Sequence, residues 1–292
     1  MKQTVCFGEV LFDQFKDKAI PGGAPMNVAL HFQQLGYRSH MLSMVGNDQK
    51  AEELLNFLKE RNLDTSFIGT NDSLPTGLVI VDDSDPMNVK YDIVKPAAWD
   101  AIPWTAESQK LIDESDVFVF GSLAVREEVS RNCLLKYLKN TKTLKVFDIN
   151  IRPPFDDLEL LEKILVHTDI LKVNEQELQI LADYHEFGEN IEIACEKLEE
   201  AYELKFICMT RGADGALIYQ NGEIFEHEGY EIQVVDTVGS GDAFLAALIF
   251  GYLEGEKLEE MLDFACALGT YVAGQQGATP IYDVNEVKRI IE

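Results

Sequence analysis

The chain has 292 residues, a hydrophobic content of 46% and a formal net charge of −26 at pH 7. This hydrophobic content is sufficient for a folded core and excludes a disordered chain. The charge argues against nucleic acid and anionic membrane as partners, because both are polyanions. It leaves ATP open, since one local phosphate site can be electropositive inside an acidic protein.

The five cysteines are scattered along the sequence and odd in number, and no pair has the spacing of a metal site or a redox motif. Buried, reduced thiols in the cytoplasm fit this pattern best. The first residues include Glu9 and Asp13, where a signal peptide would need an apolar core. The apolar runs are also too short to span a membrane, so we expect a soluble, cytoplasmic protein.

The first quarter of the chain contains a glycine pair in front of a helix. Residues 4–7 predict a short buried strand, and residues 10–20 predict a half-exposed strand that carries Asp13. Gly22 and Gly23 then lead into an amphipathic helix that ends near residue 35. By itself the glycine pair is only a tight turn, and Asn27 is typical of a first-turn capping residue.

The next segment changes from alternating elements to a hairpin. Residues 39–45 and 65–68 predict strands on either side of a helix over 51–61. Residues 76–81 and 89–94 then predict two strands joined by the acidic turn 82–86, with no helix between them. We expect an antiparallel hairpin, which together with residues 10–20 forms a small sheet apart from the main one.

After residue 100, short apolar strands alternate with amphipathic helices. The expected strands are 117–120, 145–149, 170–173 and 205–209, and the expected helices are 127–138, 158–166 and 190–202. This alternation predicts a parallel sheet covered on both faces, with ligands at the carboxyl ends of its strands. Two polar clusters lie at such ends, at residues 148–154 and 172–177.

Each cluster allows two interpretations. Asn150 and Arg152 are either part of a loop exit broken by two prolines or ligand contacts. Asn174 and Glu177 have the spacing of a helix N-cap and its N3 partner. Their oxygens also suit magnesium, which prefers oxygen ligands and retains water, and the two roles are compatible.

The last third carries two glycine-rich turns. Thr210, Gly212 and Gly215 form a turn before a hairpin centred on Asn221-Gly222. Helices are expected over 258–272 and 283–290. Between them and the hairpin lies the stretch 234–244, which decides how the whole chain is interpreted.

In that stretch, Gly239-Ser240-Gly241 directly precedes an apolar helical segment. The free N–H groups and the dipole of a helix N-terminus favour an anion. Asp242 lies in the same first turn, where an acid is favourable simply as a helix residue. The alternative, which we prefer, is a general base beside a phosphate-binding turn.

These motifs resemble the ribokinase-like (PfkB) sugar kinases. Residues 236–244, DTVGSGDAF, resemble the family's D-T-x-G-A-G-D-x-F signature, with Ser240 in place of the usual alanine. Residues 22–29, GGAPMNVA, resemble its N-terminal signature G-G-A-P-x-N-V-A. The resemblance covers nearly the whole length, and no Walker-type phosphate loop is present.

The resemblance implies a ribokinase-like three-layer αβα sandwich with a mainly parallel central sheet and a small antiparallel β lid. It implies one domain over residues 1–292, with the lid at about 10–20 and 74–100. In the family the final Asp of the signature is the catalytic base, and the Gly-x-Gly amides bind the transferred phosphoryl group. These roles correspond to Asp242 and to Gly239, Ser240 and Gly241.

The remaining site residues follow from the same resemblance. Sugar contacts are implied at Asp13, Gly22, Gly23, Asn27, Asn150 and Arg152. Nucleotide contacts are implied at Lys172, Asn174, Thr210, Gly212, Gly215 and Gly277. Magnesium is implied at Asn174 and Glu177, through water, and a monovalent cation such as K+ near Asp236 and Gly277. This chain has Ala265-Cys266-Ala267 where relatives often place an adenine-contacting Asn.

We therefore expect an ATP-dependent kinase that phosphorylates D-fructose to fructose 6-phosphate, with a homodimer through the lid as a further hypothesis. The D-x-N-x-R-P pattern at residues 148–153 resembles fructokinase-like and ketogluconate-kinase-like members, although Phe155-Asp156 departs from the usual continuation. Kinases for 2-keto-3-deoxygluconate, ribose or a nucleoside remain alternatives. A non-catalytic sugar-binding regulator on the same fold is the alternative from another class.

Overall fold

The computed structural model describes residues 1–82, 84 and 90–291. Its centre is a nine-stranded sheet in the order β13-β12-β11-β10-β9-β8-β1-β4-β5. Neighbouring strands are parallel from β11 to β5, and β12 and β13 extend one edge antiparallel. The strands are β1 (Gln3–Phe7), β4 (Arg38–Gly46), β5 (Ile68–Asn71), β8 (Val117–Gly121), β9 (Leu144–Asp148), β10 (Ile170–Asn174), β11 (Phe206–Thr210), β12 (Ala216–Gln220) and β13 (Glu223–His227).

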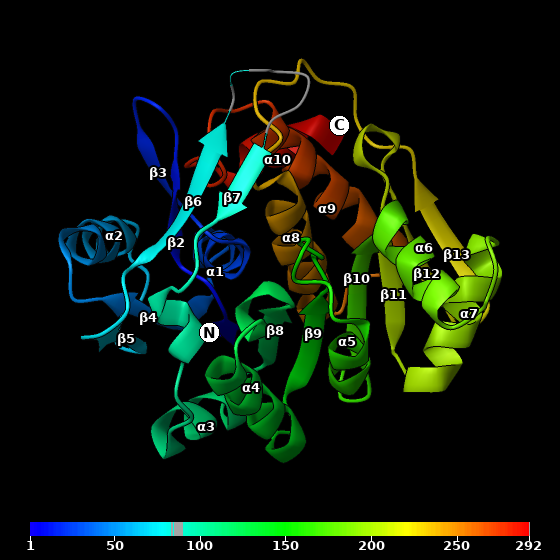
Figure 1. Cartoon of the computed structure of the whole chain (residues 1–292). Helices are drawn as coiled ribbons and strands as arrows, with labels where there is room; N and C mark the ends of the chain where they lie inside the picture. The colour runs from blue at the N-terminus through cyan, green and yellow to red at the C-terminus, as the bar shows by residue number, and fades with distance from the viewer. Residues whose placement is uncertain (83, 85–89, 292) are drawn as a thin grey trace.

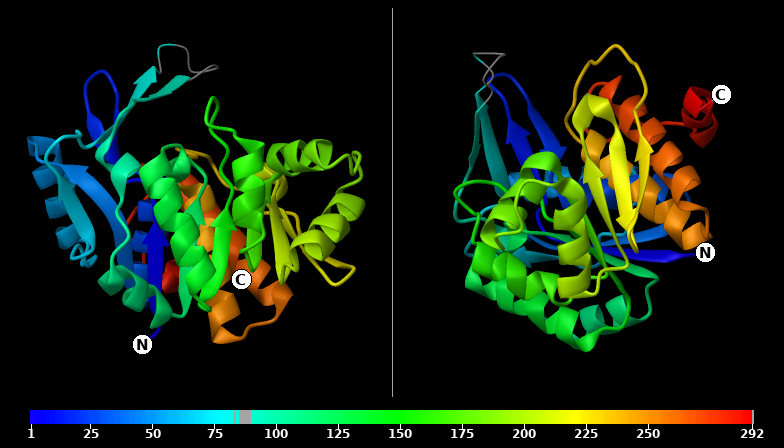
Figure 2. Two further views of the ribbon diagram at one scale, coloured as in Figure 1. Left: turned by 60° about the horizontal axis from the view of Figure 1, so that its bottom comes forward. Right: turned by 90° about the vertical axis from the view of Figure 1, so that its right-hand side faces the viewer.

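Helices cover both faces of this sheet, as Figures 1 and 2 show. Alternate residues of a strand enter opposite cores: Val119 of β8 lies in one and Phe120 in the other. The first face is covered by α1 (Ala24–Gln34), α2 (Gln49–Glu60), α8 (Ser240–Glu254), α9 (Leu258–Ala273) and α10 (Val284–Ile291). The second is covered by α3 (Ala106–Asp113), α4 (Glu128–Asn140), α5 (Leu158–Leu165), α6 (Glu175–Tyr184) and α7 (Ile191–Tyr202). The predicted three-layer αβα architecture is confirmed.

A separate four-stranded sheet stands above the carboxyl ends of the main strands, at the upper left of Figure 1. It consists of β2 (Leu11–Gln14), β3 (Ala19–Gly22), β6 (Gly77–Asp82) and β7 (Lys90–Ile93), in the order β3-β2-β6-β7. The outer pairs are antiparallel, as expected, and the central pair β2–β6 is parallel. In the predicted acidic turn, residues 83, 85 and 86 lie outside the described residues, as does Val89 of the predicted strand 89–94.

Three local predictions need correction. Residues 10–20 form two strands because a turn closes between them, with the Phe15 amide donating to the Lys18 carbonyl at 2.8 Å. The strand expected at 65–68 begins only at Ile68, because the preceding residues form a turn in which the Ile68 amide donates to the Thr65 carbonyl. Helix α3 was not predicted, although Thr105 caps it through a hydrogen bond from the Ser108 amide.

Short 3₁₀ helices complete the described elements: η1 (Ala98–Ala101), η2 (Leu123–Val125) and η3 (Gly212–Asp214). Within the described part of the chain, every helix is too short or too polar to cross a bilayer. The polar clusters predicted at strand ends do follow β9 and β10, which pair in parallel. Their side chains therefore meet at one edge of the main sheet, below the small sheet.

Candidate active site

The turn in front of α8 forms the N-terminus of that helix. Gly239 is the N-cap with φ of 78°, and no side chain caps the helix. A Cβ at this position would lie 2.4 Å from the Cβ of Ala278, so only glycine fits between the turn and residue 278. Ser240 begins the helix and donates its hydroxyl to the Thr237 carbonyl at 2.9 Å. The Ser240 amide donates to the Thr237 carbonyl at 3.3 Å, which leaves the first-turn amides of Gly241 and Asp242 available to an anion.

Asp242 lies in this first turn and is joined to the opposite end of the sequence. The Asn27 side-chain amide, from the first turns of α1, donates to Asp242 Oδ2 at 2.8 Å. Burial and the nearby charge of Asp148 raise the pKa of Asp242 to about 6, against the Asn27 hydrogen bond and the charges of Lys172 and Arg152. A carboxylate with this pKa is ionised near neutral pH and still basic enough to accept a proton.

A buried ion pair lies beside that turn. Lys172 of β10 donates to Asp148 Oδ1 of β9 at 2.9 Å, and the two residues are register partners in the parallel sheet. Burial alone would lower the pKa of Lys172, but the charge and hydrogen bond of Asp148 outweigh it, and the net direction is upward. A Cβ on Gly241 would lie 3.6 Å from Lys172 Nζ. A permanent positive charge therefore faces the same space as the α8 amides.

The glycine pair brings the small sheet against α1. Gly23 is the N-cap of α1 with φ of 118°, and a Cβ there would lie 2.4 Å from the Glu9 carbonyl oxygen. Gly22 ends β3 directly beside Asp13 of β2, whose Oδ2 would be 2.6 Å from an added Cβ. Burial, followed by the charge of Asp236, raises the pKa of Asp13 to about 6. Asp13, Gly22, Gly23 and Asn27 thus line one side of the site.

Asn150 and Arg152 leave β9 on the side of the site next to η2. Asn150 has φ of 40°, an uncommon conformation for a residue other than glycine. Its carbonyl oxygen accepts a hydrogen bond from the Ser122 hydroxyl at 3.3 Å. Arg152 is exposed, and its charge lowers the pKa of Asp242, so the guanidinium acts within electrostatic range of the base.

Asn174 and Glu177 form the capping box that their spacing predicts. The Asn174 side chain accepts from the Glu177 amide, and Glu177 Oε2 accepts from the Asn174 amide, both at 2.9 Å. Glu177 Oε1 accepts the Ile151 amide at 2.9 Å. Burial and the charge of Asp148 raise the pKa of Glu177. Glu177 therefore ties the chain after β9 to the start of α6.

The residues expected near the nucleotide lie at the end of β11 and in the turn that follows it. The Thr210 hydroxyl donates to the Val173 carbonyl at 3.4 Å, Gly212 begins η3, and the backbone of Gly215 packs against the His227 carbonyl. In the segment before α8, Asp236 accepts the amides of Val238 at 3.0 Å and Gly277 at 3.2 Å. The predicted neighbours Asp236 and Gly277 are brought together, whereas Gly212 and Gly215 have no described hydrogen bond to the centre.

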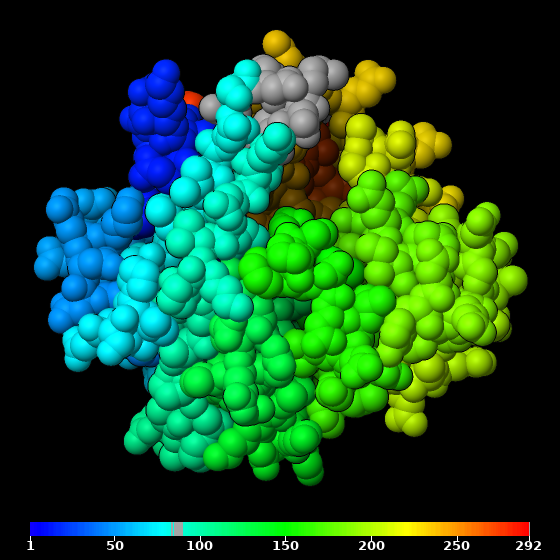
Figure 3. Space-filling view, in the orientation of Figure 1, coloured from blue at the N-terminus to red at the C-terminus, as the bar shows by residue number. Residues whose placement is uncertain are grey.

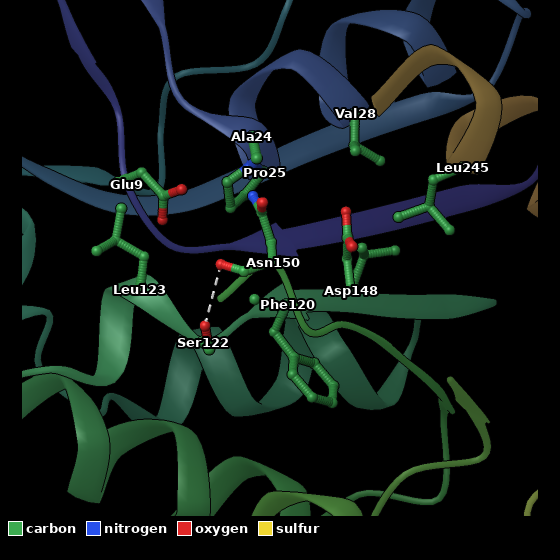
Figure 4. A pocket seen from close by; sticks show the side chains of 12 residues that line it. Glu9, Ala24, Pro25, Val28, Phe120, Ser122, Leu123, Asp148, Asn150 and Leu245 are labelled. Carbon is green, nitrogen blue, oxygen red and sulfur yellow. Dashed lines mark hydrogen bonds between the residues drawn. The ribbon is translucent and has the colours of Figure 1, made fainter. Parts of the chain in front are cut away.

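The site opens into a hollow between the small sheet and the β10–β11 side of the molecule. Figure 3 shows this hollow, with the C-terminal helices in brown at its bottom. Deeper, a cavity of about 10 Å³ is lined by Glu9, Ser122, Asp148 and Asn150 together with apolar residues. Figure 4 shows these side chains around the cavity.

The pattern of the pfkB family carbohydrate kinases matches residues 2–284 of this chain. The chain belongs to that family. It is a sugar kinase, a phosphotransferase that acts on a sugar hydroxyl.

Among its relatives, an uncharacterised sugar kinase of Pyrococcus horikoshii is 29% identical over 269 residues, which cover 87% of this chain and 82% of that protein. The crystal structure of the same kinase superposes with a TM-score of 0.85 over 100% of both chains. A protein named probable fructokinase-6, chloroplastic, of Arabidopsis thaliana is 28% identical over 312 residues, covering 97% of this chain and 80% of its own length. The fructokinase of Xylella fastidiosa, solved with bound ATP, has a TM-score of 0.88 at 21% identity and covers 99% and 98% of the two chains. Other relatives are named 6-phosphofructokinase, 2-dehydro-3-deoxygluconokinase and aminoimidazole riboside kinase.

The residues around the centre of this sugar kinase fit a magnesium ion held mainly by phosphate and water. Both Glu177 oxygens accept backbone amides, so this carboxylate is poorly free to bind a metal directly. The described residues contain no group of three His, Cys, Asp or Glu side chains arranged to hold an ion. Magnesium keeps several waters and commonly binds through few protein ligands plus substrate phosphates. The role of Asn174 and Glu177 toward magnesium through water therefore stays a prediction.

Two acidic residues of the site were not among those predicted. Asp148 was considered only as part of the polar cluster at residues 148–154, and Glu9 only as an acid near the start of the chain. The position of Asp148 at the carboxyl end of a parallel strand was a usable signal. For Glu9 the sequence carries no comparable signal, since its burial depends on α1, η2 and the chain after β9.

Proposed function

We propose that this sugar kinase transfers the γ-phosphoryl group of ATP to D-fructose, forming fructose 6-phosphate and ADP. The observation that carries the proposal is Asp242 in the first turn of α8, hydrogen-bonded to Asn27 and facing the Lys172–Asp148 pair. A base (Asp242), the N-terminus of α8 as an anion-binding group, and the Lys172 cation therefore lie close together beside the start of α1. Several relatives with the name fructokinase, and the Asn150-x-Arg152 sequence, support the choice of sugar.

In the proposed step the phosphoryl group passes directly from ATP to the sugar, and the protein forms no covalent bond to it. The oxygen of the fructose 6-hydroxyl attacks the γ-phosphorus, its proton passes to Asp242, and the bond between the γ-phosphorus and the β–γ bridging oxygen breaks to release ADP. The amides of Gly241 and Asp242 and the Lys172 ammonium stabilise the charge on the transferred group. Asn27 keeps Asp242 oriented toward the hydroxyl. Catalysis is then mostly positioning and electrostatic stabilisation.

ATP and magnesium are the cofactors we propose, and the solved relatives support both. The Pyrococcus horikoshii kinase, 26% identical, has been solved in complex with ATP. A ribokinase-like relative from E. coli was solved with ATP and Mg2+, and a fructokinase of Vibrio cholerae with potassium ion. When bound, magnesium would neutralise phosphate charge. We propose K+ near Asp236 and Gly277, on the side of α8 where these two residues already meet.

The test is ADP release with ATP and magnesium over a panel of fructose, ribose, 2-keto-3-deoxygluconate, tagatose and adenosine. Fructose should give the highest kcat/KM, and Asp242→Asn should lower kcat by about a hundredfold or more, the usual range for a lost general base. A preference for another acceptor would correct the sugar and keep the mechanism. If no acceptor is turned over while sugar still binds, the kinase proposal fails and a sugar-binding role replaces it.

We also propose that two copies pair through the small sheet. Ile80 of β6 is 46% exposed and pairs with Asp92, whereas Tyr91 of β7 is 56% exposed and pairs with Val81, so these two large apolar side chains lie on opposite faces of the sheet. We take the Ile80 face as the surface that pairs. Light scattering should give a dimer mass for the parent and a smaller mass for Ile80→Lys. A monomer at working concentration would remove this proposal.

The cytoplasm is the compartment we propose, because all five cysteines are free and buried and no disulfide stabilises the described fold. Cell fractionation that follows the kinase activity tests this directly. Recovery from an oxidising compartment would contradict it.

A further inference from the structure

A buried carboxyl group below the sugar side of the site has no role in the reaction as derived so far. Glu9 connects β1 to β2 and is only 3% exposed. Its Oε2 atom has no hydrogen-bond partner among the described residues. It lines the cavity of about 10 Å³ with Ser122, Asp148 and Asn150, and that volume matches a single water molecule.

Glu9 lies between the two turns that flank the sugar side. Its backbone carbonyl contacts Gly23, so the residue packs directly against the start of α1. Across the cavity lies Asn150, held in its left-handed conformation with its carbonyl oxygen on the Ser122 hydroxyl. In Figure 4 the Glu9 carboxyl group and the Asn150 side chain both point into the space between these turns.

A carboxyl group is a costly way to fill this position. An unpaired buried charge loses its hydration, whereas an apolar side chain of similar size would fill the same space without that loss. Perturbed acids in such settings cluster at functional sites. The carboxyl group therefore calls for an explanation beyond packing.

The charged groups around Glu9 determine its protonation. Burial, and then the charge of Asp242, raise the pKa of Glu9 to about 7, against the amides of Glu9 and Ala24 and the charge of Arg152. Asp148 lines the same cavity, but its charge is paired with Lys172. Two carboxyl groups within electrostatic range of each other ionise most easily one at a time, which favours a neutral Glu9 while Asp242 is ionised.

We propose that Glu9 is a positioning residue of the kinase reaction, whose carboxyl group holds the Asn150 turn against the Gly22-Gly23 turn. In the neutral form it has one O–H donor and one carbonyl acceptor for the polar groups of the cavity. With the two turns fixed, the sugar is held in one position relative to Asp242. In the ionised form it loses the donor and places a second negative charge near Asp242. This inference rests on the proposed function, because positioning has meaning only for the sugar reaction.

The first measurement needs no activity. The folded-state pKa of Glu9 lies above its unfolded value, so its contribution to stability is full below about pH 4.5 and is lost as pH rises through about 7. Urea unfolding should therefore show the parent losing stability relative to Glu9→Gln over that window. Glu52→Gln, an exposed acid on α2, should track the parent. If the difference in unfolding free energy between the parent and Glu9→Gln stays constant over this pH range, Glu9 is not neutral in the folded protein.

The second measurement uses whichever sugar of the panel is turned over. For the parent, kcat/KM should fall above about pH 7, and Glu9→Gln should lack that fall while losing about threefold or less near pH 6. Glu9→Leu, which keeps the volume and loses both hydrogen-bonding groups, should lose about tenfold near pH 6 and should also lack the alkaline fall. If Glu9→Gln keeps the alkaline fall, or Glu9→Leu matches Glu9→Gln, the positioning role is wrong.

Failure of the two proposals can be told apart. A parent that turns over no acceptor contradicts the proposed function, and the unfolding series still tests the protonation of Glu9. Thermal melting with the binding sugar adds a readout of positioning. A smaller sugar-induced stabilisation in Glu9→Leu than in Glu9→Gln supports the role, and equal stabilisation contradicts it.

Discussion

The two sheets of this sugar kinase differ in the size of the core that holds them. Among the described residues, the small sheet's own core consists of Leu11, Val79 and Val81, with Phe15 and Ile93 packed against it, while Phe12 and Leu78 pack with one core of the main sheet. The main sheet is covered by large cores on both faces, and its strands β8 to β11 have buried side chains along most of their length. Local stability follows buried apolar contact, so the small sheet opens at lower cost than the main one.

The residues of the site are likewise divided between the main body and the small sheet. Asp242, Asp148 and Lys172 lie on α8, β9 and β10, which belong to the well-packed body. Of the predicted sugar contacts, Asp13 and Gly22 belong to the small sheet. We infer that groups on the main body set the rate of transfer, and that groups on the small sheet act mainly on sugar binding. The following substitutions test this division.

The largest effect is expected from Lys172→Met. It leaves Asp148 buried and unpaired, which should cost about 3 kcal/mol or more of unfolding free energy. It also removes the cation beside the α8 turn, so kcat should fall in the folded fraction. Urea unfolding and ADP release measure both effects.

The matched control is Lys145→Met, which breaks the more exposed pair of Lys145 with Asp169 at 2.8 Å. It should cost about 1 kcal/mol or less and leave kcat unaffected. Equal losses in the two variants would mean that the buried Lys172 pair is no more demanding than this partly buried pair.

Local sequence patterns predicted the elements whose geometry is decided by neighbouring residues. The glycine turn before α8, the Asn174–Glu177 capping box and the hairpin at Asn221-Gly222 are of this kind, and all are present. The split of residues 10–20 into two strands was missed, although the charged run Lys16-Asp17-Lys18 breaks the alternation where the chain turns between Phe15 and Lys18.

Contacts between distant segments could not be derived from pattern. Asn27 and Asp242 are separated by 215 positions, and only the packing of α1 beside α8 joins them. Asp148 and Lys172 meet because β9 and β10 pair in a particular register. The burial of Glu9 requires three separate segments to close over it. Each of these depends on the tertiary fold and leaves no periodic trace in the sequence.

A smaller effect, on pH dependence, is expected from Asn27→Leu. The Asn27 hydrogen bond stabilises the ionised form of Asp242, so its removal should raise the pKa of Asp242 from about 6. Because the base must be ionised, the acid limb of kcat/KM should move to higher pH by about one to two units. Asn56→Leu, an exposed residue of α2, serves as the control. An acid limb that stays in place would show that Asn27 does not hold the base.

The smallest effect is expected from Asp13→Asn on the small sheet. Asp13 lies beside Gly22 on the small sheet, so the change removes a charged acceptor for sugar hydroxyls and leaves Asp242, Asp148 and Lys172 in place. KM for the sugar should rise about tenfold with kcat changed by less than about threefold. Asp17→Asn, exposed in the same hairpin, should change neither constant. If Asp13→Asn lowers kcat as much as it raises KM, the small sheet takes part in the transition state, and the division between a transferring body and a binding sheet does not hold.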